Sequence, residues 1–251
     1  LVSGFPADTD RPAMMTTDQS GCSNGYVGAN SSNGSVAYNG FENHSGGNAE
    51  NSSCSYTSTF NGTSSAAPTV AGVVALMLEA NPALTWRDVK HILATTADQV
   101  GSDSDNSYTF RGLKQYEWET NSAGYKFHNW FGFGKIDAAE AVTTAASYTA
   151  NSRGTFSSAA ASSGSINIAI NDNGTNATSS LNVTKPSGSN DFVEFVTLSV
   201  QLSHPVPKSI GLRLQSPDGT VINVMTPMTN IGTNPSSTIF QIGVAGLYGE
   251  S

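Results

Sequence analysis

Charged side chains are scarce in this 251-residue sequence, and basic ones are scarcer than acidic ones. Lys, Arg, Asp and Glu together make up 12% of the residues, with 11 basic against 19 acidic side chains and a formal net charge of −8. A chain with this balance and no basic patch is a poor ligand for nucleic acid or for an anionic membrane. Its surface must be solvated mainly by Ser, Thr, Asn and Gly. Such a composition suits an exported protein, secreted or periplasmic.

Long apolar runs and cysteine clusters are also missing. No apolar run approaches the roughly 20 residues that a helix needs to cross a bilayer, so no membrane span is predicted. The sequence starts Leu1-Val2-Ser3, without the charged segment of a signal peptide, and we expect the true N-terminus to lie elsewhere. The two cysteines, Cys22 and Cys54, have no other Cys or His at ligand spacing, which argues against a zinc site.

The most informative stretch is residues 61–68, Asn-Gly-Thr-Ser-Ser-Ala-Ala-Pro, which introduces a predicted apolar helix. Gly62 permits a tight turn and the close approach of a ligand, and Ser64 falls at the start of the helix. Unpaired amides and the positive end of the helix dipole would stabilise an oxyanion formed when Ser64 attacks a carbonyl group. Pro68 is expected in the first turn, where its missing N–H costs nothing. The alternative is that Ser64 is merely an N-cap, since serine is favoured there.

A longer stretch around Ser64 carries a family resemblance. Residues 62–72, Gly-Thr-Ser-Ser-Ala-Ala-Pro-Thr-Val-Ala-Gly, resemble the Gly-Thr-Ser-x-Ala-x-Pro-x-x-x-Gly serine block of subtilisin-like serine proteases. Residues 78–89 resemble the next stretch in the kexin and furin branch, and residues 130–142 resemble the closing turn and last helix of the catalytic domain. The resemblance implies an α/β subtilisin-like fold and a secreted endopeptidase with a Ser-His-Asp triad, whose nucleophile is Ser64. It also implies cleavage after basic residues, although the acidic pocket for them would come from upstream segments.

The other two triad residues are not recognisable in this chain. In the family the Asp and His blocks and an oxyanion Asn all lie well upstream of the serine block, and only 63 residues precede Ser64 here. Asp8, Asp10 and His44 have the right order, but they lie in polar turns and loops and are expected to be solvated. The chain alone is therefore predicted to be inactive. Its expected partners are a peptide or protein substrate and the upstream part of the same protease, which carries Asp, His and Asn.

Calcium and a disulfide complete the expectations for the catalytic part. The resemblance implies calcium for the complete enzyme, with ligands mostly upstream, so no metal or cofactor site is expected in this chain. Residues 103–106 could be taken for a calcium loop but lack the Gly and Glu of an EF-hand. Cys22 and Cys54 bracket a segment rich in Gly, Asn and Ser, and a disulfide between them would staple this loop in an oxidising compartment. The alternative is that one of them pairs with an upstream cysteine.

Two helices are predicted after Ser64. The first should be buried in the core through apolar positions at helical spacing, namely Val70, Val73, Val74, Met77 and Leu78. The second opens with Thr85 and Asp88 in the arrangement of a capping box and presents Val89, Ile92 and Leu93. His91 on this helix is expected to be a surface or partly packed residue without chemistry. A loop over residues 98–121 follows, and Asp137 is the predicted N-cap of a last helix.

The pattern changes after Tyr148. Residues 149–165 are rich in Ser, Ala and Gly and are predicted to link the catalytic part, residues 1–148, to a second domain, residues 166–251. Residues 210–220 resemble the Leu-x-Ser-Pro-x-Gly-Thr hairpin of the P domain of proprotein convertases, an all-β jelly roll or β-sandwich. Apolar and polar residues alternate in five predicted strands, at residues 166–170, 192–202, 209–215, 221–224 and 238–244. Five strands are fewer than the roughly seven of a stable sandwich, so the domain is predicted to be incomplete.

Two functional classes follow from these observations. The first is a secreted serine endopeptidase of which this chain carries only the nucleophile, Ser64. The second is an inactive fragment or pseudo-protease whose β-sandwich acts as a binding or folding-support module. An upstream part with the Asp and His blocks would favour the first class.

Overall fold

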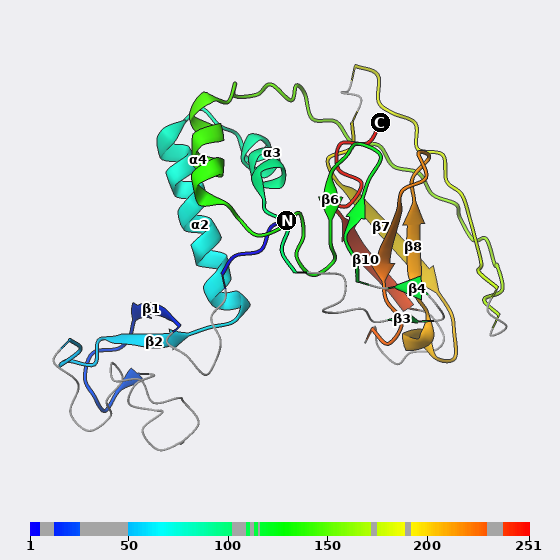
Figure 1. Cartoon of the computed structure of the whole chain (residues 1–251). Helices are drawn as coiled ribbons and strands as arrows, with labels where there is room; N and C mark the ends of the chain where they lie inside the picture. The colour runs from blue at the N-terminus through cyan, green and yellow to red at the C-terminus, as the bar shows by residue number, and fades with distance from the viewer. Residues whose placement is uncertain are drawn as a thin grey trace.

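The computed structural model describes residues 1–5, 13–25, 50–101, 109–110, 113–114, 116–171, 175–188, 192–229 and 238–251. Three helices lie together on one side of the molecule, and the longer strands of the C-terminal half lie on the other (Figure 1). A small antiparallel pair, β1 (Met14–Thr17) and β2 (Tyr56–Phe60), projects from the helical side. The chain runs from β2 almost directly into α2 (Thr63–Ala80), and the candidate site lies at this junction.

α2 (Thr63–Ala80), α3 (Trp86–Thr96) and α4 (Ala138–Ser147) pack around one apolar core. Its buried members come from all three helices and from the segment before α4, and they include Met77, Ile92, Ile136, Ala141 and Ala145. These side chains follow the apolar spacing in the sequence, because an i, i+3 or i+4 repeat gathers them on one face of each helix.

Both predicted N-terminal caps are confirmed. At α3, the Asp88 carboxylate accepts the Thr85 amide at 2.8 Å while the Thr85 side chain accepts the Asp88 amide at 3.3 Å. At α4, the Asp137 carboxylate accepts the Glu140 amide at 2.9 Å. Each cap satisfies amides that the first helical turn leaves unpaired, and so fixes where its helix begins.

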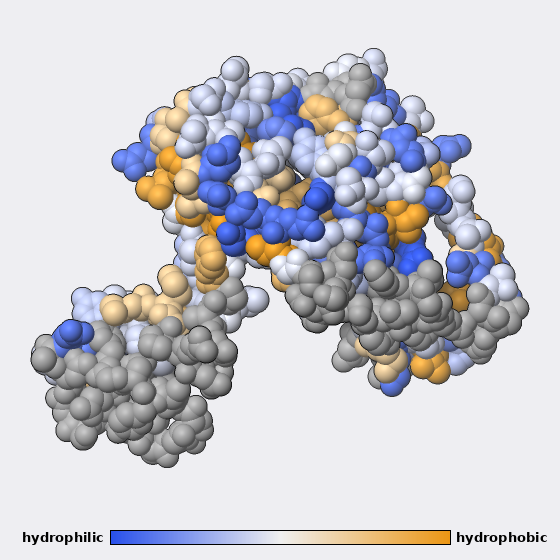
Figure 2. Space-filling view, viewed as in Figure 1, coloured by the Kyte–Doolittle hydropathy of each residue, from blue (hydrophilic) through white to orange (hydrophobic). Residues whose placement is uncertain are grey.

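The prediction that α2 is buried in the core is only partly right. Val73 and Met77 are buried, but Leu76 and Leu78 are 51% and 39% exposed. α4 packs against α2, and the N-terminal segment reaches Ala66 and Val70 near its start, but neither covers Leu76 and Leu78. Figure 2 shows apolar side chains at the surface of the helical side. The exposed face follows from the arrangement of the described elements, because α3 and α4 together reach only part of the helix surface.

By length and composition α2 also qualifies as a candidate membrane span, which the search for apolar runs in the sequence did not predict. Its 18 residues have a mean hydropathy of 1.3. The core helix of a soluble protein passes the same test, so this finding is weak evidence for a membrane.

Four of the five strands predicted after Tyr148 are confirmed, and among the described residues they form two antiparallel pairs. β7 (Val196–Leu202) pairs with β10 (Thr238–Val244), and β8 (Leu212–Gln215) pairs with β9 (Val221–Met225). A short 3-10 turn, Pro207–Ser209, precedes β8. Two apolar clusters join the pairs, one with Leu202, Ile210 and Met225 and the other with Ile222, Val244 and Leu247.

The predicted strand at residues 166–170 is wrong. Ile166, Ile168 and Ile170 are 50%, 44% and 41% exposed, and the segment has no regular structure. Alternating residues form a strand only where a neighbouring strand completes the hydrogen bonds, and no described strand pairs with this one. The described residues between α4 and β7 contain no helix or strand, so the irregular stretch is longer than the predicted linker.

The predicted loop over residues 98–121 is partly paired. β3 (Thr109–Phe110) pairs with β4 (Leu113–Lys114), and β5 (Glu119–Thr120) pairs with β6 (Lys126–Phe127). These strands have two residues each, which is too short for the alternation of a sequence pattern to reveal them.

Candidate active site

The serine block forms the N-terminus of α2. Gly62 is the N-cap residue, with φ 72° and ψ −165°, and the helix begins at Thr63. The Gly62 carbonyl accepts the amides of Ser65 at 3.1 Å and Ala66 at 3.2 Å. A positive φ favours glycine, which accounts for the residue at this position. Ser64 is the second residue of the helix, so the alternative that it is the N-cap is wrong.

Pro68 lies further into α2 than the sequence analysis predicted. It is the sixth residue of the helix and not part of the first turn. Proline has no N–H, so the Ser64 carbonyl lacks the amide four residues on that it would otherwise accept. The turn that carries Ser64 is thus one backbone hydrogen bond short.

The two adjacent serines have different environments. Ser64 is exposed, and its hydroxyl has no hydrogen-bond partner among the described residues. Ser65 is 0% exposed, and its Oγ donates to the Gly62 carbonyl at 2.9 Å. The amides of Thr63 and Ser64 also lack partners in the described part of the chain, and the first turn of α2 contains no acidic residue. Of the two serines, Ser64 therefore has the hydroxyl that a ligand can reach, at the positive end of the helix dipole.

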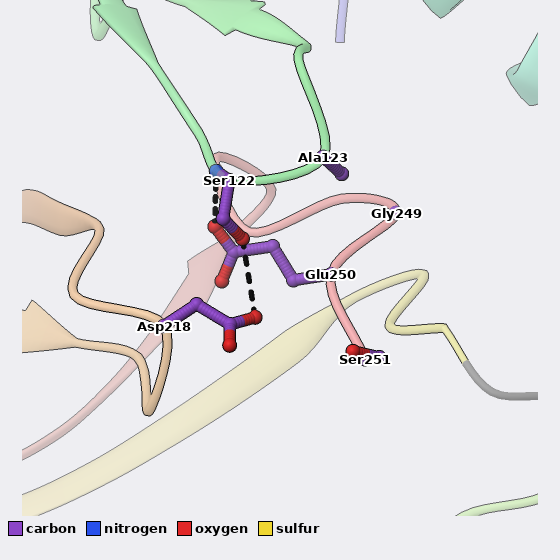
Figure 3. A pocket seen from close by; sticks show the side chains of 6 residues that line it. All are labelled: Ser122, Ala123, Asp218, Gly249, Glu250 and Ser251. Carbon is purple, nitrogen blue, oxygen red and sulfur yellow. Dashed lines mark hydrogen bonds between the residues drawn. The ribbon is translucent and has the colours of Figure 1, made fainter.

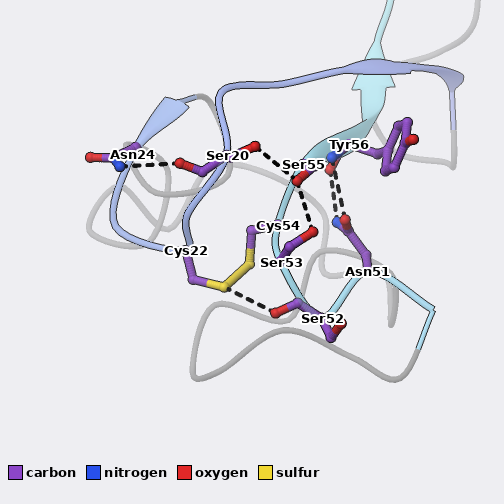
Figure 4. The surroundings of a disulfide bond; sticks show 9 residues. All are labelled: Ser20, Cys22, Asn24, Asn51, Ser52, Ser53, Cys54, Ser55 and Tyr56. Carbon is purple, nitrogen blue, oxygen red and sulfur yellow. Dashed lines mark hydrogen bonds between the residues drawn. A yellow bond between two sulfur atoms is a disulfide. The ribbon is translucent and has the colours of Figure 1, made fainter.

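A disulfide anchors the strand that leads into this site. Cys22 and Cys54 are joined, with Cα atoms 4.9 Å apart, so the predicted pairing is confirmed over the pairing with an upstream cysteine. The Asn51 side chain holds the start of β2, because its Nδ2 donates to the Tyr56 carbonyl at 2.8 Å and its Oδ1 accepts the Tyr56 amide at 3.2 Å (Figure 4). Since β2 ends two residues before Gly62, this anchor restricts the start of α2.

No second triad residue contacts Ser64 among the described residues. Asp8, Asp10 and His44 lie outside the described residues, as do residues 103–106. In the described ranges, no group of three or more His, Cys, Asp or Glu side chains could hold a metal ion.

His91 lies where α3 meets the C-terminal half. Its Nδ1 is 2.9 Å from the Tyr248 hydroxyl and 2.7 Å from Arg153 Nη1. A guanidinium only donates hydrogen bonds, so Nδ1 is the acceptor and the imidazole is neutral. Burial, followed by the positive charge of Arg153, lowers the pKa of His91 to about 4. His91 is partly packed, as predicted, and it belongs to the contact between the two halves.

An ion cluster fastens α3 to the C-terminal half. Arg87 Nε donates to the two carboxylate oxygens of Glu194 at 3.1 and 3.0 Å, and Arg87 Nη2 donates to the same carboxylate. Arg153 Nε lies 3.6 Å from Glu194 Oε1. Burial acts to raise the pKa of Glu194, but the hydrogen bonds of Arg87 and the charges of both arginines outweigh it and lower this pKa. No sequence pattern indicated this cluster, because Arg87 and Glu194 are 107 residues apart.

A shallow, open pocket marks a second contact between the helical side and the C-terminal residues (Figure 3). The Ser122 amide donates to Glu250 Oε1 at 3.0 Å, and the Ser122 hydroxyl donates to Asp218 at 3.2 Å. Burial acts to raise the pKa of Glu250, but hydrogen bonds from Thr220 and other neighbouring hydroxyl and amide groups outweigh it and lower this pKa. These bonds join two turns to the last residues of the chain, so the carboxylates have a structural role here.

The sequence analysis selected Ser64 but missed the role of Ser65. Ser65, Thr69, Val73 and Met77 are spaced by four, and three of them are buried. This spacing defines the inward face of α2 and would have placed Ser65 on it, one residue away from the exposed Ser64.

The comparison with protein families gives the class of the segment that contains this site. Residues 13–134 match the Subtilase family, Peptidase_S8. The predicted resemblance to subtilisin-like serine proteases is therefore confirmed, and this segment is a subtilase segment.

Curated relatives agree with this class. The Aeromonas extracellular serine protease of Aeromonas sobria is 37% identical over 157 residues, which cover 59% of this chain and 24% of that protein. Neuroendocrine convertase 2 of Drosophila melanogaster is 45% identical over 87 residues, which cover 35% of this chain and 12% of that protein. Human proprotein convertase subtilisin/kexin type 6 is 31% identical over 190 residues, covering 75% and 18%. Kexin-like proteases are thus among the relatives, and the chain spans about a quarter or less of their length.

Solved structures support the subtilisin-like fold. The serine protease of Aeromonas sobria superposes with a TM-score of 0.63 at 25% identity, over 96% of this chain and 43% of the solved chain. The same protease in complex with its chaperone gives a TM-score of 0.62 at 24% identity, over 96% and 42%. The chain therefore spans less than half of these solved proteases.

Proposed function

We propose that the complete protein is a secreted, kexin-like serine endopeptidase in which Ser64 is the nucleophile. The observation that carries this proposal is the environment of Ser64, which is exposed and unbonded among the described residues at the start of α2. The neighbouring Ser65 hydroxyl is buried and already donates to Gly62. A nucleophile needs an exposed, unbonded hydroxyl like that of Ser64, because its oxygen must reach the substrate carbonyl and its proton must reach a base.

In this proposal an imidazole from the upstream part of the protease removes the Ser64 proton as Oγ bonds to the peptide carbonyl carbon. The amide of Ser64 and the positive end of α2 stabilise the oxyanion. The C–N bond then breaks as the imidazolium returns the proton to the leaving amine. Water hydrolyses the acyl group from Ser64 in the second half of the reaction.

The remaining parts of the enzyme follow from the same proposal. The upstream part supplies Asp, His and the oxyanion Asn, and the ligands for calcium. The resemblance to the kexin branch favours cleavage after basic residues. The C-terminal strand pairs form an incomplete P domain, which supports the catalytic part through the Arg87–Glu194 contact. A chaperone, as in the solved complex of the Aeromonas sobria protease, is a further candidate partner.

Covalent labelling tests the assignment. A fluorophosphonate should label the full-length protease at Ser64, as located by peptide mapping, while Thr63 and Ser65 stay unlabelled. Ser64→Ala should abolish both labelling and peptide hydrolysis, with a loss of several orders of magnitude in rate. A fully active Ser64→Ala variant, or labelling of another residue in an active enzyme, would contradict the proposal.

A second experiment measures peptide hydrolysis by the purified 251-residue chain alone. We expect no measurable hydrolysis by the purified chain, because without a base Ser64 stays a neutral hydroxyl. Hydrolysis by this chain that Ser64→Ala abolishes would refute the need for an upstream part. In the full-length enzyme, paired peptides with Arg or Ala before the scissile bond measure the proposed preference for basic residues.

A further inference from the structure

The carbonyl of Gly62 collects three hydrogen bonds at the start of α2. Two come from the backbone amides of Ser65 and Ala66, at 3.1 and 3.2 Å, and the third comes from the Ser65 hydroxyl at 2.9 Å. The Ser65 side chain thus donates to the carbonyl of the residue three before it. It does not accept an amide, as a serine at an N-cap does.

Packing does not hold Gly62 in its conformation. A Cβ built on Gly62 would have no heavy atom within 4 Å, so the space around this residue is open. Its φ of 72° with ψ of −165° lies in a region that residues other than glycine rarely adopt. Glycine has many alternative conformations, and the hydrogen bonds to its carbonyl act on Gly62 directly, in addition to the anchor on β2.

The first turn of α2 also lacks one backbone hydrogen bond, at the Ser64 carbonyl. Pro68 provides no amide for the Ser64 carbonyl, so the backbone of Ser64 is held more weakly than in a regular helix. The Ser65 carbonyl accepts the Thr69 hydroxyl at 3.0 Å in addition to its helical amide. The Thr69 bond thus lies one position beyond Ser64 in the helix and does not reach Gly62.

We infer that Ser65 is a positioning residue, whose hydroxyl fixes the Gly62 carbonyl and thereby orients the Ser64 hydroxyl and amide toward the substrate carbonyl. This inference rests on the proposed role of Ser64 as nucleophile. Gly62 and Ser64 are two residues apart, so a rotation of the Gly62 peptide redirects the first turn of α2. Small errors in the placement of a nucleophile reduce the rate, because the reacting atoms must meet within about 3 to 3.5 Å.

The test compares Ser65→Ala with Thr69→Val in the full-length protease. Each variant removes one side-chain hydrogen bond from the same turn, but only Ser65→Ala removes the bond to Gly62. We expect Ser65→Ala to lower kcat and the rate of Ser64 labelling by about 3- to 10-fold, the effect of one lost hydrogen bond, with KM changed by less than about twofold. Thr69→Val should keep both rates within about twofold. Its urea midpoint should fall by about as much as that of Ser65→Ala, since each variant loses one side-chain hydrogen bond.

Two further variants separate positioning from a general effect on folding. Ser65→Thr keeps the hydroxyl and should recover part of the rate, whereas Ser65→Cys keeps the volume with a weaker donor and should give an intermediate rate. Equal rates for Ser65→Ala and the wild type, or an equal loss in Thr69→Val, would overturn the inference. If Ser64 is labelled normally in Ser65→Ala, only the role of Ser65 is wrong. If Ser64→Ala remains active, the proposed function itself is wrong.

Discussion

Replacing Glu194 by glutamine keeps the shape of the side chain but removes the negative charge between Arg87 and Arg153. The three side chains are 11%, 13% and 10% exposed, so water can do little to replace the lost carboxylate. Removing one partner of a buried ion pair typically costs about 3 to 5 kcal/mol, because the remaining charge stays buried without compensation. Since two guanidinium groups face Glu194, we expect Glu194→Gln to lower the free energy of unfolding by about this amount.

Urea denaturation at neutral pH measures this loss. With an m value of about 3 kcal/mol/M, the midpoint should fall by about 1 to 1.7 M. Glu79→Gln is the matched control, because Glu79 is an exposed glutamate on α2, and it should change the free energy by no more than about 0.5 kcal/mol.

A double-mutant cycle shows whether the loss of stability in Glu194→Gln comes from leaving Arg87 without its partner. If the lost charge leaves Arg87 uncompensated, Glu194→Gln should cost less in an Arg87→Met background than alone, with a coupling energy above about 1 kcal/mol. A Glu194→Gln variant as stable as the control, or strictly additive effects, would refute the electrostatic account of this contact.

Two further predictions concern pH and the disulfide. The pKa of His91 is lowered to about 4 from an ordinary 6.5, so between these pH values the unfolded state binds the proton more tightly. The free energy of unfolding should therefore fall as the pH drops from 6.5 toward 4, and His91→Asn should flatten this part of the profile. Replacing Cys22 and Cys54 by serine opens a loop with a sequence separation of 32 and should cost about 3 to 4 kcal/mol in urea denaturation, and an unchanged midpoint would show that the bond restrains little.

The features that could be predicted from the sequence are local. The caps at Thr85 and Asp137 each depend on residues within three positions, and the serine block fits within one helix start. The disulfide could be predicted because only two cysteines are present, so the alternatives were few. In each case the interacting residues are either close in sequence or, for the cysteines, so few that little choice of partner remains.

The features that could not be predicted depend on partners distant in sequence. Residues 166–170 have the alternation of a strand, but they do not form one. A strand also needs a neighbouring strand to bond with, and alternation in the sequence does not show whether one is present. The contact between Arg87 and Glu194 spans 107 residues, and the bond of His91 with Tyr248 spans 157. The position of Pro68 was wrong for a local reason: proline is common in the first turn of a helix, but even counted from Ser64 it is the fifth residue, beyond one turn of about 3.6 residues.

In the proposed full-length protease, one upstream part would supply the missing triad residues and cover the exposed face of α2. Apolar side chains such as Leu76 and Leu78 are costly to leave in water on a helix that is not bound to a membrane or a partner. The solved proteases that share this fold are more than twice as long, so the rest of such a protein is large enough to cover the helix. Leu76 and Leu78 lie 12 and 14 residues beyond Ser64, about 18 to 21 Å along α2, so one cover would have to run along most of the helix to bury them and also reach the serine. In the proposed full-length protease the upstream part would do both, burying the apolar face and bringing a histidine and an aspartate to the Ser64 hydroxyl.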